Sequence, residues 1–143
     1  IEAQNLKNSL IIRTNFFGKS YANNRLSFSD YLIYNITKKS NVSVPSNIYF
    51  NPIHINHLLD IIFKLMNKKI TGVFNIGSED YISKFDFAKK IVLKKKLNAK
   101  YLKSFKSDYL IHQRPFSTIM STKKIKSKIK IKLPSVQSGI NLL

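Results

Sequence analysis

Short apolar runs alternate along this chain with longer segments in which apolar residues recur at helical spacing. Residues 9–14 (SLIIRT), 41–52 (NVSVPSNIYFNP) and 71–78 (TGVFNIGS) are rich in β-branched residues and lead into Asn, Pro or Gly, so each predicts a short strand. The amphipathic segments predict helices over residues 27–39, 53–67, 83–96, 121–133 and 133–143. Strands that alternate with helices indicate an α/β fold in which at least some strands pair in parallel.

Local signals indicate where three of these helices begin. The Ser27 hydroxyl can accept a hydrogen bond from the backbone N–H of Asp30, and Ser83 stands in the same relation to Asp86. Both serines are therefore expected N-caps. Pro134 is expected in the first turn of the last helix, where its missing N–H costs no hydrogen bond.

Helical spacing also predicts which side chains face the core. In the helix over 53–67 these are Ile55, Leu58, Leu59, Ile62, Leu65 and Met66. Phe87 and Ile91 are expected to face inward in the helix over 83–96, and Ile125 and Ile129 in the helix over 121–133. Residues 99–105 are expected to be extended, and residues 1–6 are expected to be the end of a helix.

Lysine dominates the composition without identifying a partner. The formal net charge is +18, and only Arg13, Arg25 and Arg114 among the 25 basic residues are arginines. The lysines are spread over almost the whole chain, which favours solvated faces over a nucleic-acid surface, where basic residues would gather on one element among exposed aromatics. The densest run, residues 121–133, is explained by an amphipathic helix with its lysines outside.

Other function classes are excluded or disfavoured by what the sequence lacks. The chain has no cysteine, which excludes disulfides, thiolate zinc sites and cysteine nucleophiles. Its histidines and carboxylates have no metal-ligand spacing, so no metal site is expected. No apolar run approaches the roughly 20 residues of a membrane span, and the first residues lack the pattern of a signal peptide. We therefore expect a cytoplasmic setting.

The strand over 9–14 ends in side chains that can hold a polar ligand. Thr14 and Asn15 follow its apolar run, and Phe16 comes next. Ligands in α/β proteins bind at the carboxyl ends of the strands, so this end of the strand is a candidate site. The three arginines are further candidates, because a guanidinium offers a planar fork to phosphate or carboxylate that lysine cannot imitate.

The order of motifs along the chain resembles the C-terminal half of extended short-chain dehydrogenases/reductases. The motifs are RTNFFG, SFSDYLI, FNPIHINHLLDIIFKLM, GVFNIGSEDYISKFDFAKKI, RP and LPSVQSGI. Within that family the chain is most similar to the dTDP-4-dehydrorhamnose reductases and related sugar-nucleotide reductases. The resemblance implies that residues 1–143 are a single substrate-binding portion of an NAD(P)-binding Rossmann-like enzyme, made of the last Rossmann strand and the region after it. A thin sheet of two or three strands is expected to bury much of its surface against an upstream cofactor-binding half.

The resemblance also implies roles for residues near the end of the first strand. Thr14, Asn15 and Phe16 would line the floor of a nucleotide-sugar site, and Asn15 and Phe16 would also contact the NADP or NAD cofactor. Arg25 would reach a phosphate, although a solvated loop arginine explains it equally well. Asn15 has the alternative of a turn residue that satisfies its own backbone. The aromatic rings of Phe17 and Phe28 are expected in the core.

Three more substrate-binding residues follow from the later motifs. Pro52 and His54 would lie under the substrate where the helix over 53–67 begins, and Arg114 would lie near the pyrophosphate. His54 is alternatively a hydrogen-bonded residue at the helix start, and Arg114 is alternatively a partner in a structural salt bridge.

The family's catalytic groups have no counterpart in this sequence. Its glycine-rich cofactor turn is not matched by Gly72 and Gly77, whose spacing differs. The family's proton donor is the tyrosine of a Tyr-x-x-x-Lys motif. Tyr34 and Lys38 have that spacing, but they follow the strand that the family's catalytic helix precedes. We expect no catalytic residue in these 143 residues, with the cofactor bound mainly upstream. An epimerase or dehydratase acting on a nucleotide sugar, and a basic nucleic-acid-binding module, remain alternatives.

Overall fold

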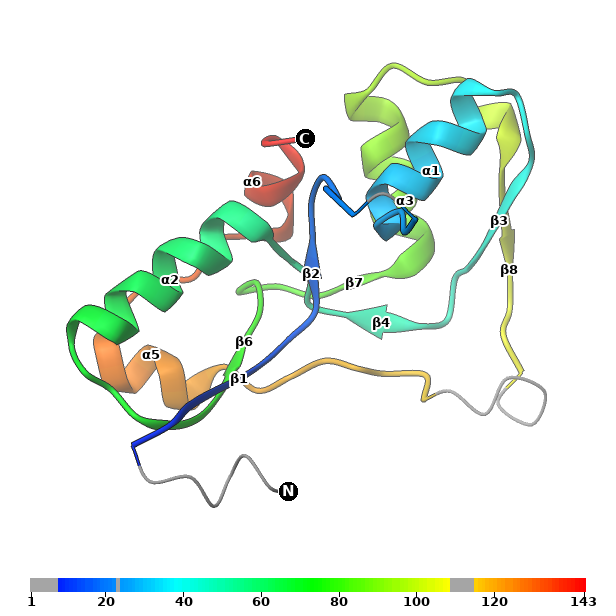
Figure 1. Cartoon of the computed structure of the whole chain (residues 1–143). Coiled ribbons are helices and arrows are strands. Elements are labelled where there is room, and N and C mark those ends of the chain that lie inside the picture. The colour runs from blue at the N-terminus through cyan, green and yellow to red at the C-terminus, as the bar shows by residue number, and fades with distance from the viewer. Residues whose placement is uncertain (1–7, 23, 109–114) are drawn as a thin grey trace.

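The computed structural model describes residues 8–22, 24–108 and 115–143 (Figure 1). The helix end expected over residues 1–6 lies outside the described residues, and so does Arg114. The strands are β1 (Leu10–Thr14), β2 (Phe16–Phe17), β3 (Val42–Pro45), β4 (Tyr49–Phe50), β5 (Ile53–His54), β6 (Gly72–Ile76), β7 (Ile82–Ser83) and β8 (Leu102–Phe105). The helices are α1 (Phe28–Thr37), α2 (Ile55–Asn67), α3 (Lys84–Lys94), the 3₁₀ turn η2 (Ala99–Tyr101), α5 (Lys123–Ile129) and α6 (Val136–Ile140).

Parallel pairing joins strands that lie far apart in the sequence. Strand β1 pairs with β6, with Leu10 opposite Gly72 and Thr14 opposite Ile76. Strand β3 pairs with β8, and β2 pairs with β5, both in parallel, whereas β4 and β7 pair antiparallel. The α/β fold with parallel strands that the sequence predicted is therefore confirmed.

The segment over 41–52 differs from the prediction of one strand. It forms two, β3 and β4, separated by a bend in which Asn47 exchanges hydrogen bonds with Ser107: Asn47 Nδ2 donates to Ser107 O at 2.9 Å, and Ser107 N donates to Asn47 Oδ1 at 2.8 Å. The segment over 99–105 begins with the turn η2 and becomes extended only from Leu102 onward.

The predicted serine caps are confirmed. The Asp30 N–H donates to Ser27 Oγ at 3.1 Å, and the Asp86 N–H donates to Ser83 Oγ at 3.0 Å. Pro134, however, lies before the last helix and not in its first turn. Ser135 is the N-cap of α6, because its hydroxyl accepts from the otherwise unpaired Ser138 N–H at 3.0 Å.

Two clusters of buried side chains stabilise the chain. The first joins α1, α3, α6 and β3, and it buries Phe87 and Ile91 as predicted. The second joins α2 and α5 to β1 and β6, and it buries Ile125 and Ile129 as predicted. Phe17 belongs to the first cluster at 3% exposure, so its expected core position is confirmed.

The buried face of α2 differs in part from the prediction. Leu58 and Leu65 are buried as expected, but Ile61 completes this face, while Leu59 and Met66 are 41% and 58% exposed. The reason is that the apolar arc of α2 is wider than the surface that meets β1 and β6, so periodicity alone does not select which apolar residues are buried. Among the described residues, no helix is long and apolar enough to cross a bilayer.

Candidate functional site

A hollow of about 600 Å³ lies beyond the carboxyl end of β1. We call it the strand-end hollow. Four of the residues predicted to bind substrate line it, namely Thr14, Asn15, Phe16 and Arg25. Phe16 is 62% exposed, and the Arg25 side chain is also exposed, so both can meet a ligand from solvent. The structure thus brings together residues from β1, β2 and the loop before α1.

Thr14 and Asn15 contribute different polar groups to this hollow. Thr14 Oγ1 is buried and has no hydrogen-bond partner among the described residues. Because a buried hydroxyl without a partner is costly, this atom is a ready contact for a polar ligand. Asn15 Nδ2 donates to Thr118 O at 2.9 Å, a contact between residues 103 positions apart. Its side chain therefore bridges two segments of the fold. The alternative, a turn residue whose side chain hydrogen-bonds its own backbone, does not describe this contact.

Residues 18–20 and 25–27, in the loop before α1, form the side of the strand-end hollow. Ser20 holds it in place, since its N–H donates to Asp30 Oδ2 at 2.7 Å and its hydroxyl donates to Arg25 O at 2.7 Å. Gly18 has φ +145°, and a Cβ there would lie 2.7 Å from Ile55 Cγ2. Only glycine lets the loop pass this close to the start of α2.

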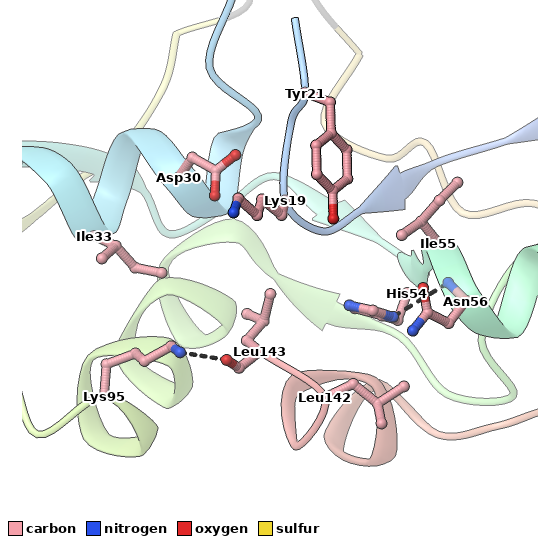
Figure 2. A pocket seen from close by; sticks show the side chains of 10 residues that line it. All are labelled: Lys19, Tyr21, Asp30, Ile33, His54, Ile55, Asn56, Lys95, Leu142 and Leu143. Atoms are coloured by element: carbon pink, nitrogen blue, oxygen red, sulfur yellow. Dashed lines mark hydrogen bonds between the residues drawn. The ribbon is translucent and has the colours of Figure 1, made fainter.

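A second hollow of about 400 Å³ adjoins the first and shares Lys19 and Ile55 with it. We call it the helix-end hollow, and Figure 2 shows its lining. Tyr21 directs its hydroxyl into it, with Lys19 and His54 on either side (Figure 2). At its far end Lys95 Nζ donates to Leu143 O.

His54 is the N-cap of α2 and lines the helix-end hollow. Its ring Nδ1 accepts from the Asn56 N–H at 3.2 Å, so the predicted alternative of a hydrogen-bonded residue at the helix start describes this contact. Burial lowers the pKa of His54 below the ordinary 6.5, and the nearby imidazole of His57 lowers it further. The ring is therefore neutral near pH 7 and can cap the helix as an acceptor.

Pro52 and Phe28 take largely structural positions. Pro52 is buried, and its carbonyl accepts from the buried Ser78 hydroxyl at 2.5 Å. The Phe28 ring lies parallel to Phe87 with centroids 6.0 Å apart, which confirms its expected packing against the core, although it also borders the strand-end hollow.

Sequence reasoning missed an asparagine clamp on the segment 117–121. Asn51 Nδ2 donates to Met120 O at 3.0 Å, and Asn75 Nδ2 donates to Ser121 O at 3.3 Å, in addition to the bond from Asn15 to Thr118. Each of these three asparagines stands at or near the carboxyl end of a strand. That position was the available signal, but their partners lie 46 to 103 residues further along the chain.

A known protein family matches the whole of this chain. The family model described as "RmlD substrate binding domain" matches residues 1–143. This chain belongs to that family. At the level of sequence, none of the curated proteins matches it.

Solved structures with a similar fold are about twice as long as this RmlD substrate binding domain. It is similar to dTDP-4-dehydrorhamnose reductase from Bacillus anthracis in complex with NADP, with a TM-score of 0.79 and 22% identity, over 93% of this chain and 47% of that chain. The same reductase from Yersinia enterocolitica gives a TM-score of 0.72 and 20% identity, over 93% and 47% of the two chains.

An enzyme of a different reaction class has a similar fold. The dTDP-glucose 4,6-dehydratase from Bacillus anthracis in complex with NAD gives a TM-score of 0.73 and 12% identity, over 93% of this chain and 42% of that chain. The chain thus spans about half the length of the solved reductases it matches. At these identities the likeness shows the fold.

Two lysines of the helix α5 make contacts within this RmlD substrate binding domain. Lys126 Nζ and Glu79 Oε1 form an ion pair at 2.5 Å, and the hydrogen bond from Lys126 lowers the pKa of Glu79. Lys124 Nζ donates to Val73 O at 2.8 Å and lies over the Phe74 ring. These contacts favour the interpretation of a solvated amphipathic helix over that of a nucleic-acid surface.

Within the ranges the structure describes, no three His, Asp or Glu side chains are grouped to hold a metal.

Proposed function

We propose that this chain is the substrate-binding part of an NAD(P)-dependent sugar-nucleotide reductase of the dTDP-4-dehydrorhamnose reductase type. The observation that carries the proposal is the strand-end hollow, which gathers Thr14, Asn15, Phe16 and Arg25 in a chain of the RmlD substrate binding domain family. The substrate of the proposed reaction is a keto-sugar linked to a nucleoside diphosphate.

The hollow offers complementary chemistry to the parts of such a substrate. Arg25, with Lys19 beside it on the same loop, supplies positive charge for the pyrophosphate. The unpaired Thr14 hydroxyl and the Asn15 amide suit the hydroxyl groups of a sugar. Arg114 stays a proposed pyrophosphate ligand from the sequence, and it lies outside the described residues.

The described residues fit one side of a nicotinamide cofactor. Asn15 lines the strand-end hollow together with Phe16, and the exposed ring of Phe16 offers an apolar surface of the kind on which a nicotinamide packs. We propose that Asn15 and Phe16 contact the cofactor here. No glycine-rich turn occurs in the sequence to cradle its pyrophosphate, so this chain would supply one wall of the cofactor site only.

In the proposed reaction the side chains of this domain bind and orient the substrate. A reduced nicotinamide held against Asn15 and Phe16 would supply a hydride to the keto carbon, and the tyrosine of the family's Tyr-x-x-x-Lys motif, which has no counterpart in these 143 residues, would supply the proton to the carbonyl oxygen. Arg25 and Lys19 anchor the pyrophosphate, which fixes the sugar in the strand-end hollow against Thr14 and Asn15. Such positioning lowers the entropic cost of the reaction. The cytoplasmic setting expected from the sequence is part of this proposal.

A second candidate is a dehydratase or epimerase that acts on a nucleotide sugar. Its support is the dTDP-glucose 4,6-dehydratase, which has a TM-score of 0.73 to this chain, close to that of the Yersinia reductase. Both reaction classes use the same kind of substrate. The natural-length protein separates them, because only a reductase consumes stoichiometric NADPH or NADH when it is given a nucleotide-linked keto-sugar.

Binding of dTDP-glucose to the protein tests the substrate site. We expect dTDP-glucose to raise the melting temperature in a concentration-dependent manner, because a ligand that binds only the folded state stabilises it. Arg25→Ala should abolish most of this shift. Arg13→Ala is the matched control, since Arg13 is also exposed but lies outside the hollow. An equal loss in both variants, or no shift in the unmodified protein, would contradict the proposed site.

A titration with duplex DNA tests the basic-module alternative. Micromolar binding that falls steeply with salt would favour a nucleic-acid partner. We expect neither tight binding nor loss of the dTDP-glucose shift when DNA is added.

A further inference from the structure

The helix-end hollow is a second cavity, and the proposed reaction takes place outside it. Its volume of about 400 Å³ is enough for a small organic molecule. Its lining comes from the loop before α1, from α1, from the start of α2, from the C-cap of α3 and from residues 142 and 143. The cavity is therefore built by the tertiary fold and not by one loop.

A buried histidine directs an N–H group into this hollow. His54 is 5% exposed, and its Nδ1 accepts from the Asn56 N–H at 3.2 Å. A neutral imidazole carries one hydrogen, so an Nδ1 that accepts leaves the hydrogen on Nε2. The Nε2 end of the ring faces the hollow (Figure 2), and this N–H has no acceptor among the described residues. The cap of α2 thus fixes both the tautomer and the direction of a buried donor.

Lys19 and Tyr21 add two donors from the loop before α1. The Tyr21 hydroxyl points into the hollow, and Lys19 Nζ lies 5.4 Å from the centre of the Tyr21 ring (Figure 2). Lys19 forms no ion pair with any described residue. Together with His54 Nε2, these groups present three donors from two elements to one space. Three donors suit the three terminal oxygens of a phosphate monoester better than the two oxygens of a carboxylate.

The charge balance of the lining favours an anion. Lys19 and Lys95 carry positive charge, and Asp30 is the one acidic group among the described residues of the lining. The Asp30 Oδ2 atom accepts from the Ser20 N–H at 2.7 Å, so part of this carboxylate is already engaged by the protein. The hollow also lies at the N-terminus of the 13-residue helix α2, where the helix dipole favours negative charge.

The rest of the lining is largely apolar. Ile33, Leu142 and Leu143 line the hollow away from Tyr21, and Leu142 is 48% exposed (Figure 2). A ligand that covered these side chains would remove apolar surface from water. The molecule that fits the whole lining therefore carries an anionic group at one end and an apolar body at the other.

We propose that the helix-end hollow binds a phosphate monoester with an apolar or aromatic body, whose phosphate oxygens accept from Lys19 Nζ, Tyr21 Oη and His54 Nε2. The body of the ligand lies against Ile33 and Leu142. This site is distinct from the strand-end hollow, although Lys19 lines both. The inference does not depend on which substrate the strand-end hollow takes.

Calorimetric titration with phenyl phosphate at neutral pH tests this site in the protein at its natural length. We expect Tyr21→Phe to weaken binding about tenfold, because the variant loses one hydrogen bond to a charged group. Tyr21 is 86% exposed, so its hydroxyl is removed without disturbing the core. Tyr34→Phe is the matched control and should bind as the unmodified protein does, since Tyr34 is an exposed tyrosine of α1 outside the hollow.

Two further variants locate the ligand. His54→Asn keeps a favourable N-cap residue, but its side chain is too short to place a donor where Nε2 lies, so it should also weaken binding about tenfold. Arg25→Ala removes a charge from the strand-end hollow and should leave the affinity for phenyl phosphate unchanged. A loss of binding in Arg25→Ala but not in Tyr21→Phe would overturn the proposal, because the ligand would then occupy the strand-end hollow.

Two simpler anions test the chemistry of the ligand. Inorganic phosphate lacks the apolar body, and phenylacetate replaces the phosphate with a carboxylate, so each should bind about fivefold more weakly or less than phenyl phosphate. Equal affinity for phenylacetate would overturn the assignment to a phosphate, and equal affinity for inorganic phosphate would overturn the apolar contact. No binding of phenyl phosphate, or equal binding by Tyr21→Phe and the unmodified protein, would overturn the site itself. None of these titrations uses dTDP-glucose, so their outcome is separate from that of the proposed function.

Discussion

Asn51 and Met120 exchange two hydrogen bonds across the fold. Asn51 Nδ2 donates to Met120 O at 3.0 Å, and the Met120 N–H donates to Asn51 Oδ1 at 3.0 Å. The asparagine is 3% exposed and follows β4 directly. Its side-chain amide pairs with the backbone of the segment 117–121 as the backbone of a neighbouring strand would. That segment also reaches Asn15 in the strand-end hollow, which links the stability of the clamp to the shape of the candidate site.

The first prediction concerns this clamp. Asn51→Ala should lower the free energy of unfolding by about 1–3 kcal/mol, because it removes both bonds and leaves a backbone N–H and C=O partly buried without partners. Denaturant unfolding measures the change. Asn75→Ala is the control, since it loses one exposed bond of 3.3 Å and should cost well under about 1 kcal/mol. Equal effects of the two substitutions would contradict the role of Asn51.

The second prediction concerns Gly77, which lies against the same asparagine. A Cβ at Gly77 would come within 2.6 Å of Asn51 O and 2.7 Å of Asn51 Nδ2. Gly77→Ala should therefore destabilise the protein by about 1–3 kcal/mol through overpacking, as measured by denaturant unfolding. Thr71→Ala, at an exposed position before β6, should stay within about 0.5 kcal/mol of the unmodified protein.

The third prediction separates two neighbouring phenylalanines. Phe17 is 3% exposed and contacts the rings of His54 and Phe87, so Phe17→Ala should cost about 3–5 kcal/mol of stability. Phe16 is 62% exposed, so Phe16→Ala should leave the unfolding free energy nearly unchanged. It should nevertheless weaken dTDP-glucose binding, measured by calorimetry. Unaltered binding by a folded Phe16→Ala variant would remove Phe16 from the site.

The fourth prediction concerns the pH dependence of stability. The pKa of His54 is lower in the folded protein than its ordinary 6.5, so the unfolded state binds more protons in the interval between the two values. The contribution of His54 is therefore complete above about pH 6.5 and is lost as the pH falls through the folded value. Unfolding free energies measured between pH 7.5 and pH 5 should show this decline.

Two variants assign the decline to His54. In His54→Asn the asparagine can still cap α2, because Asn is a favourable N-cap residue, and the decline in this pH range should largely disappear. His57→Gln should retain most of it, since burial is the larger cause of the lowered pKa of His54. A decline that persists in His54→Asn would assign it to other groups.

The features that the sequence predicted correctly depend on neighbours in the chain. Ser27 and Ser83 cap their helices through contacts three residues away, and the apolar runs at β1 and β6 are recognisable from composition alone. The features that it missed depend on tertiary contacts. Leu59 and Met66 fit the apolar pattern of α2 as well as Leu58 does, and only the position of the sheet decides which of them is buried.

The candidate site also combines features that chain neighbours determine with features that tertiary contacts determine. Thr14, Asn15 and Phe16 were predicted from the family resemblance and from their place at the end of a strand, and the structure places them in one hollow with Arg25. The actual contact of Asn15 could not be predicted, since its partner Thr118 is 103 residues away. His54 lies in the adjoining hollow, and Pro52 is buried two residues before it.

The long parallel pairings have a consequence for how this protein reaches its native state. Leu10 pairs with Gly72, and Val42 pairs with Leu102, so each two-stranded ladder closes a large loop of chain before any of its hydrogen bonds form. Loop closure of this kind costs entropy in advance of the contacts that compensate for it. We therefore expect slow folding from denaturant. The apolar strands Leu10–Thr14 and Gly72–Ile76 are vulnerable to aggregation until they pair.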